Sequence, residues 1–230
     1  MGWIIFLALC FGLPLLLFLA AFVVGCIERH PVRMFESAQL QSASDYMQAV
    51  ARDAYALGYQ WRDGGIHTKF RDKIQAGLLL SSDRLTLAIV GDGHIAGMRS
   101  RKSILICKLR NGQIVMTVDE AGTAELDPLT TRQIIMNANF NELHRAHVAK
   151  LMELPPAEPF PPEAGWEQID ELYRGKSDRV VQRGLAQYTD PRREFFRYTM
   201  WGSFRTSILH GIGQLLVPAN YWRTYKRRPR

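Results

Sequence analysis

The sequence predicts an α+β protein in which an N-terminal transmembrane helix precedes a small antiparallel β-meander domain with flanking helices. Three observations predict this class: a charge-free opening, short β-prone runs separated by turn residues, and a proline-rich stretch followed by a helical C-terminal region. The predicted segments are a transmembrane anchor (1–27), a juxtamembrane connector (28–43), the α+β domain (44–153), a Pro-rich spacer (154–165), a helical region (166–217) and a basic tail (218–230).

The anchor is predicted from its length and composition, because the first 27 residues contain no Asp, Glu, Lys or Arg. About 20 apolar residues suffice to cross a bilayer as a helix. Residues 4–24 include fifteen Leu, Ile, Phe or Val, which favour insertion by about 5 to 9 kcal/mol. Arg29 and Arg33 follow the span and no basic residue precedes it. Since basic flanks stay in the cytoplasm, we expect a single-pass protein of the cell membrane, with the N-terminus outside and residues 28–230 cytoplasmic.

Cys26 provides an alternative to a retained anchor. The run Val23-Val24-Gly25-Cys26 resembles a bacterial lipobox, whose cysteine would carry diacylglycerol. The apolar run is long and lacks a basic residue ahead of it, and both features favour a retained helix over a cleaved signal. Cys107 stands alone in the remainder of the chain, so no disulfide framework is expected.

The α+β domain begins with a predicted helix between Ser44, a suitable N-cap, and Gly58, a suitable C-terminal stop. Five β-prone runs follow: Tyr59–Trp61, Ile74–Leu80, Leu85–Val90, Ser103–Arg110 and Gln113–Val118. The pair Asn111-Gly112 between the last two runs predicts a type I′ hairpin, because both residues tolerate positive φ.

Two more helices are predicted at the end of this domain. Asp127-Pro128 is typical of a helix start, and Asn139 with Glu142 forms a capping-box pattern for a second helix that carries His147 on its apolar face. Five prolines between Leu154 and Pro162 then exclude regular structure and favour an extended spacer.

The C-terminal region is predicted to hold one helix over Trp166–Tyr188 and a second over residues 192–217, capped by Asp190-Pro191. The second helix carries an apolar stripe: Trp201, Phe204, Ile208, Ile212 and Leu215. Arg205 in its middle disfavours a membrane crossing. Three contacts for the stripe stay open, namely packing on the preceding helix, a lipid surface, and another membrane protein or a second copy of the chain.

Cations beside the stripe favour anionic lipid headgroups. The 29 basic and 22 acidic residues give a net charge of +7. The candidate cations for a lipid surface are Arg197, Arg205, Arg223, Lys226, Arg227, Arg228 and Arg230. Each tail cation adds up to about 1 kcal/mol at such a surface. The predicted partners are therefore the lipid bilayer and its anionic headgroups, and a single short basic tract disfavours nucleic acid.

No catalytic motif is recognisable. The chain lacks Gly-x-Ser-x-Gly and a phosphate loop, and His144 and His147 lack the zinc-protease arrangement. We therefore expect no catalytic residue, metal or cofactor, and a non-catalytic binding or scaffolding module at the inner membrane face. The alternative is an enzyme or small-ligand-binding domain that uses the meander face through His67, His94 or Arg99.

Overall fold

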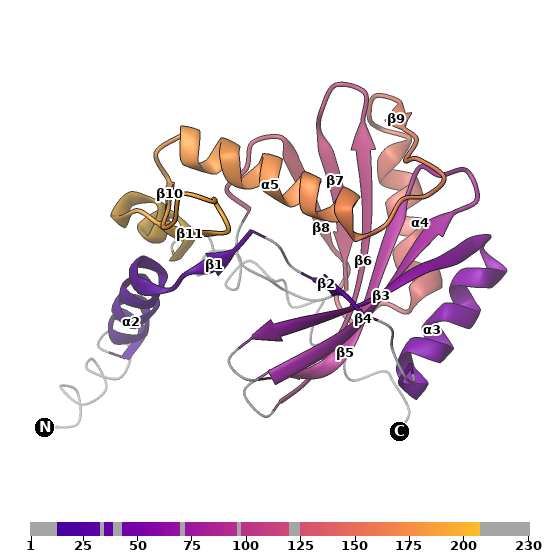
Figure 1. Cartoon of the computed structure of the whole chain (residues 1–230), viewed down its shortest axis with the longest axis horizontal. Helices are drawn as coiled ribbons and strands as arrows, with labels where there is room; N and C mark the ends of the chain where they lie inside the picture. The colour runs from indigo at the N-terminus through magenta and orange to yellow at the C-terminus, as the bar shows by residue number, and fades with distance from the viewer. Residues whose placement is uncertain are drawn as a thin grey trace, which may run out of the picture. The chain divides into compact units, whose positions relative to one another are not determined.

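The computed structural model describes residues 13–32, 35–38, 43–69, 72–95, 98–119 and 125–207 (Figure 1). The chain divides into two compact units. Unit 1 comprises Met1–Val32, Thr123–Leu126 and Ser177–Arg230, and unit 2 comprises Arg33–Gly122 and Asp127–Lys176.

Unit 2 is built on an eight-stranded sheet in which β2 to β8 are neighbours in chain order and β9 pairs with β6. The strands are β2 (Glu36–Ser37), β3 (Tyr59–Lys69), β4 (Asp72–Ser81), β5 (Leu87–Ile95), β6 (Met98–Leu109), β7 (Ile114–Val118), β8 (Thr130–Ile134) and β9 (Ala157–Glu158). All pairs are antiparallel except β7 with β8, which is parallel. The predicted α+β class is therefore confirmed, but the sheet is mixed.

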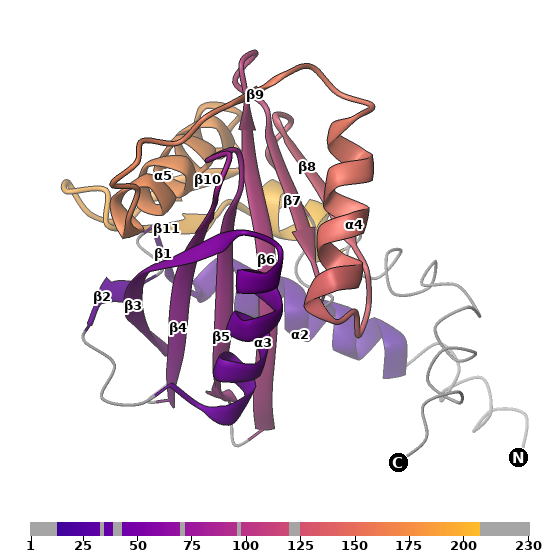
Figure 2. The same ribbon diagram turned by 90° about the vertical axis from the view of Figure 1, so that its right-hand side faces the viewer.

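Helices α3 (Asp45–Ala56) and α4 (Phe140–Leu151) cover one face of this sheet (Figure 2). Both begin as predicted, because the Ser44 hydroxyl accepts from Met47 N and the Asn139–Glu142 capping box is formed. Their apolar faces pack on alternate residues of the central strands, among them Leu79 and Leu105. Each cap is worth about 1 kcal/mol.

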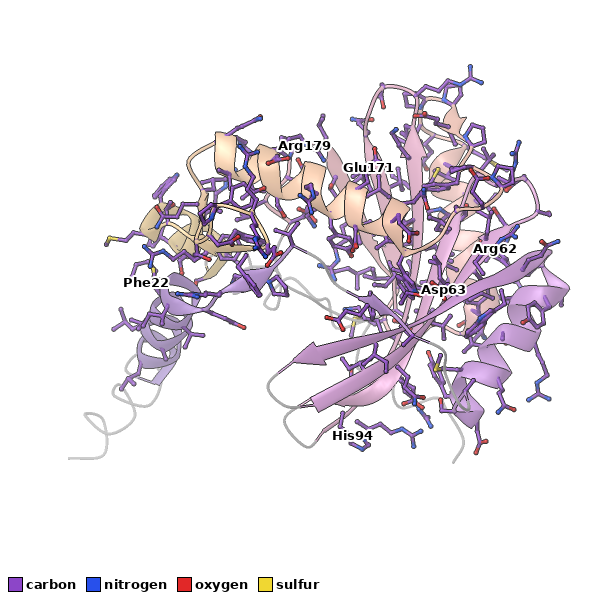
Figure 3. All side chains as sticks on the ribbon, in the orientation of Figure 1. Phe22, Arg62, Asp63, His94, Glu171 and Arg179 are labelled. Carbon is purple, nitrogen blue, oxygen red and sulfur yellow. The ribbon has the colours of Figure 1, made fainter. Side chains whose placement is uncertain are left out.

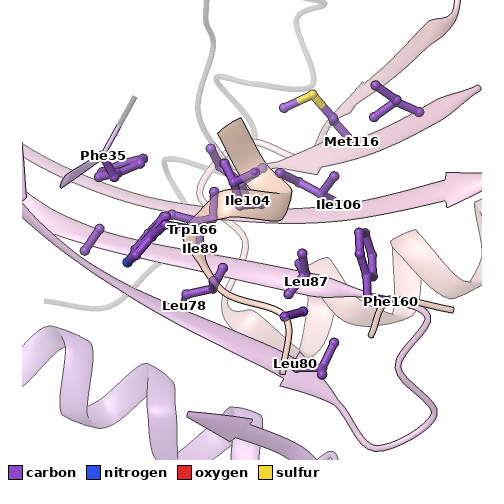
Figure 4. Packing of buried hydrophobic residues seen from close by; sticks show 14 of the residues in the cluster. Phe35, Leu78, Leu80, Leu87, Ile89, Ile104, Ile106, Met116, Phe160 and Trp166 are labelled. Carbon is purple, nitrogen blue, oxygen red and sulfur yellow. The ribbon is translucent and has the colours of Figure 1, made fainter. Parts of the chain in front are cut away.

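The opposite face is closed by residues 160–176, which include the first turns of α5 (Trp166–Gln182). Figure 4 shows Trp166 and Phe160 packed among aliphatic residues of β4, β5 and β6. The Trp166 indole donates to the Gly64 carbonyl at 3.0 Å. It lies over Gly65, where an added Cβ would be 2.8 Å from the ring. The neighbouring glycine thus provides the space that the largest core side chain requires.

The proline-rich segment is not free of the sheet. Ala157 and Glu158 form β9 and pair with Leu109 and Lys108 of β6, and Phe160 N donates to Arg84 O at 2.8 Å. Where the sequence predicts a spacer, the chain passes from α4 to α5 in contact with the sheet.

Two turns differ from their predictions. Gly112 has a φ of 82°, and Asn111 does not have positive φ, so the β6–β7 hairpin is not type I′. Gly112 N donates to Leu109 O at 2.9 Å, which is typical of a type I turn followed by a left-handed glycine. Asp127 caps a turn that leads into β8 instead of a helix, since its carboxylate accepts from Thr130 Oγ1 at 2.6 Å.

Unit 1 combines helix α2 (Leu13–Ile27) with a three-stranded antiparallel sheet and a helix over residues 200–207. The sheet has the order β1 (His30–Pro31), β11 (Phe195–Tyr198), β10 (Ala186–Tyr188). The helix predicted over 192–217 is therefore wrong at its start. The Asp190 carboxylate accepts from Glu194 N and Phe195 N, at 3.1 and 2.9 Å, and this reverses the chain so that β11 pairs back on β10.

The prediction of a transmembrane helix also has to be corrected, and this correction has the larger consequence. Within the residues that the structure describes, no helix has both the length and the apolar character needed to cross a membrane. Helix α2, Leu13–Ile27, has 15 residues, against the roughly 20 that a span requires. This finding contradicts the transmembrane anchor predicted over 1–27 and the single-pass localisation that depends on it; residues 1–12 of that segment lie outside the described residues.

Candidate functional site

Unit 1 exposes large apolar side chains on two helices that touch each other. We call this set the apolar surface: Leu16, Leu19, Val23, Val24 and Ile27 of α2, with Met200, Trp201 and Phe204. Ser203 Oγ donates to the Phe22 carbonyl at 2.7 Å, which fixes the two helices together. Figure 3 labels Phe22.

The two helices turn their small residues inward and their large ones outward. Gly202 and Ser203 are buried, whereas Met200 and Trp201 are 73% and 61% exposed. On α2, Leu16, Leu19, Val23 and Ile27 follow helical spacing and form one exposed stripe. A surface helix in water normally has the reverse arrangement, with its large apolar residues toward the core. Contiguous exposed apolar side chains mark a binding surface.

The aromatic part of this surface is ordered by stacking. The Trp201 and Phe204 rings lie 5.5 Å apart with an interplanar angle of 21°. Both residues belong to the predicted lipid-surface set, and the structure brings them together on the outside of unit 1. A stacked pair presents its two rings as one rigid apolar unit.

Cations flank the apolar surface. Arg29 follows Ile27 by two residues, Arg205 is next to Phe204, and Arg197 lies on β11 four residues before Trp201; all three arginines are exposed. With the Gln187 amide turned so that its oxygen faces Arg197, that oxygen accepts from Nε at 2.7 Å and from Nη2 at 2.8 Å. The guanidinium of Arg197 is thus held in one orientation.

The small sheet beneath these cations has one shielded face. His30 lies against Phe196 and Tyr198, with ring centroids 5.3 and 5.0 Å away. Burial, with Glu125 and Glu28 nearby, raises the pKa of Tyr198 to about 12. Tyr198 therefore stays neutral at neutral pH, and it serves packing, not acid–base chemistry.

Part of the predicted lipid-surface set lies outside the described residues. These residues are Ile208, Ile212, Leu215, Arg223, Lys226, Arg227, Arg228 and Arg230, and Arg33, predicted as a charge flanking the anchor, also lies outside. The sequence missed the α2 stripe as a partner of residues 200–207, because the connecting hydrogen bond joins positions 181 residues apart. The small residues Gly25, Gly202 and Ser203 are the signal that could have indicated a close helix contact.

Of the three residues suggested for a ligand site on the meander face of unit 2, Arg99 and His94 have described side chains. Arg99 donates to the Asp92 carboxylate from Nε at 3.2 Å and from Nη2 at 2.9 Å. Burial raises the pKa of Asp92, but hydrogen bonds from Arg99 and Ser44 and the charges of Arg99 and Arg101 lower it overall. His94 is exposed near the end of β5, whereas Asp63 lies in the inner part of β3 (Figure 3), and the His67 side chain lies outside what the structure describes.

A separate hollow of about 530 Å³ lies beside β3. Its lining residues are Ser37, Ala38, Ala43, Trp61, Arg62, Asp63 and Gly64. The Asp63 carboxylate is fixed by Ser37 Oγ and Gly64 N, both at 2.8 Å. The β3–β4 register shifts between Trp61 and Asp63, and such bulges re-aim side chains at sheet edges.

Both histidines of α4 form hydrogen bonds with other side chains of unit 2. His147 is fully buried, with Nδ1 2.9 Å from Thr117 Oγ1, and His144 Nδ1 lies 3.1 Å from the Tyr59 hydroxyl. In the part of the chain that the structure describes, no group of three or more His, Cys, Asp or Glu residues is placed to hold a metal ion.

The chain was compared with protein-family models, with curated proteins and with solved structures, and it matches none of them. The exposed surface of unit 1 and its charges are therefore the features from which function is inferred.

Proposed function

We propose that this chain is a non-catalytic binding module that attaches to an anionic lipid surface through the apolar surface of unit 1. The observation that supports it is the outward face of two joined helices, where Met200, Trp201 and Phe204 lie beside an exposed α2 stripe. Arg29, Arg197 and Arg205 flank this face. An apolar face bordered by cations is the pattern by which helices bind at the headgroup boundary, without any helix that crosses the bilayer.

The energetic support comes from the exposed area. Burying a half-exposed side chain of this size is worth on the order of 1 kcal/mol, so the residues of the apolar surface together contribute several kcal/mol to attachment. A soluble partner could cover the same residues, but the cations beside them favour a surface that carries negative charge. Cys26 on α2 is half-buried, and its lipidation stays a prediction that mass spectrometry of the mature chain tests.

The test is sedimentation of the full chain with vesicles of phosphatidylcholine and phosphatidylglycerol. The triple variant M200S/W201S/F204S should reduce binding at least tenfold, because it removes exposed apolar area and leaves the packed face of the helix unchanged. The matched control is Y55S/I134S/M152S, which removes three exposed apolar residues of unit 2 and should bind like the wild type. Equal binding by the triple variant and the wild type would refute the proposal.

A second candidate function is small-ligand binding in the hollow beside β3. The fixed Asp63 carboxylate and the half-buried Trp61 ring favour a ligand with an ammonium group, by ion pairing and cation–π contact. A panel of primary amines and amino acids should raise the melting temperature of the wild type and not of D63N. A D63N variant that responds like the wild type would rule this site out.

A further inference from the structure

Arg29, Arg197 and Gln187 occupy one row across the small sheet of unit 1. The β1–β11 register pairs His30 with Phe196 and Pro31 with Phe195, so one further antiparallel step brings Arg29 opposite Arg197. On the other side of β11, Arg197 is paired with Gln187 of β10. His30 and Phe196 belong to the neighbouring row, and their rings contact each other on the shielded face.

Continuing the β1–β11 register by this step places Arg29 and Arg197, both exposed, on the same face of the sheet. Within the described part of the chain, neither Arg29 nor Arg197 forms an ion pair with an acidic side chain. Like charges directly opposite each other on adjacent strands destabilise a sheet. An anion that binds both groups would remove this repulsion.

The orientation of Arg197 selects the kind of anion. Gln187 takes its Nε and Nη2 donors at 2.7 and 2.8 Å, so Nη1 and the second hydrogen of Nη2 point away from Gln187. Arg29 supplies a second planar set of donors. Guanidinium forks of this kind match the oxygens of a phosphate group and bind them in pairs.

We infer that Arg29 and Arg197 form a phosphate-binding site for the headgroup of an anionic phospholipid. This inference rests on the proposed function, because the site lies beside the apolar surface: Arg29 follows the exposed Ile27 by two residues, and Arg197 precedes Trp201 by four. The apolar residues supply affinity for any bilayer, and the two arginines supply the preference for negative headgroups.

The experiment compares the full chain on two kinds of vesicle, pure phosphatidylcholine and phosphatidylcholine with 30 mol% phosphatidylglycerol, at about 0.15 M salt. The double variant R29Q/R197Q should lose about tenfold in affinity for the anionic vesicles and keep its affinity for the neutral ones. The variant R197K, which keeps the charge but loses the paired donors, should lose less. Circular dichroism verifies that the variants fold.

The control is R145Q/R174Q, which makes the same change in net charge at exposed arginines of unit 2. It should keep the wild-type preference for anionic vesicles. Equal losses of affinity in both double variants would show that the effect comes from overall charge, and would overturn the site. Wild-type affinity of R29Q/R197Q for the anionic vesicles would also overturn it. If M200S/W201S/F204S loses binding to both kinds of vesicle, the apolar attachment is supported independently of the phosphate site. If the wild type binds neither kind of vesicle, the proposed function itself is refuted.

Discussion

Replacing Gly202 by alanine should unfold the part of unit 1 that carries the apolar surface. Gly202 is buried, and an added Cβ would collide with the Leu185 carbonyl oxygen, 2.7 Å from its carbon and 3.1 Å from the Leu185 Cα. These are backbone atoms, and the same carbonyl accepts from Thr199 N at 3.0 Å. Neither side of the contact can yield without breaking this bond, so we expect a loss of about 3 kcal/mol.

Hydrogen exchange followed by mass spectrometry measures this effect locally, because a chain of two units need not unfold in one step. Amides of residues 186–203 should lose protection in G202A, while those of β4 and β5 in unit 2 keep theirs. The control is G184A. Gly184 has a φ of 69° with no atom within 4 Å of an added Cβ, so only backbone strain of about 1 kcal/mol is expected. Equal exchange in the two variants would show that the Gly202 contact carries no special weight.

Acidification should destabilise unit 2 through His147. Burial, with a smaller contribution from His144, lowers the pKa of His147 from 6.5 to about 4. Its Nε2 has no hydrogen-bond partner among the described residues, so a proton there would be a buried charge without compensation. The unfolded chain binds this proton near pH 6.5 and the folded chain only near pH 4. The stability is therefore fully present above pH 6.5 and is lost as the pH falls toward 4, by about 3 kcal/mol.

The variant H147L isolates this contribution, because leucine fills the site and cannot titrate. Urea unfolding of unit 2 at pH 7 and at pH 4 should show a loss that is about 3 kcal/mol smaller in H147L than in the wild type. Carboxylates that titrate in the same range contribute equally to both proteins and cancel in the difference. The exposed His94 gives the control, since H94L should follow the wild-type profile. Parallel profiles for wild type and H147L would contradict the expectation.

Much of unit 2 could be predicted because its signals are local. Ser44 and Asn139 cap helices through residues three positions away, and the strands from β3 to β7 contain the runs of apolar residues that the sequence shows. The Asp-Pro pairs were misread for a physical reason. Asp127 and Asp190 each accept from backbone or hydroxyl groups within five residues, and the same short bonds serve a helix start or a turn equally well.

The candidate site could be predicted only in part. Trp201, Phe204, Arg197, Arg205 and Arg29 were marked by their apolar and basic character, and the structure gives all five exposed side chains. Their arrangement was not predictable, since it depends on pairing between segments far apart in the chain. The helix predicted over 192–217 placed Arg197 and Trp201 on one continuous helix, whereas β11 carries Arg197 and the next helix begins at residue 200.

The sequence by itself determined the α+β class, the caps of α3 and α4, and the residue types available for a binding surface, because these follow from contacts within a few positions. Only the tertiary structure decided that the turn at Asp190 leads to the pairing of β11 with β10. It also decided that Ser203 Oγ donates to the Phe22 carbonyl, 181 residues away in the sequence. The reason is that a side chain's local preferences are satisfied by several folds of similar energy, and long-range packing selects among them. The inward position of Gly202 and the outward position of Trp201 follow from that selection.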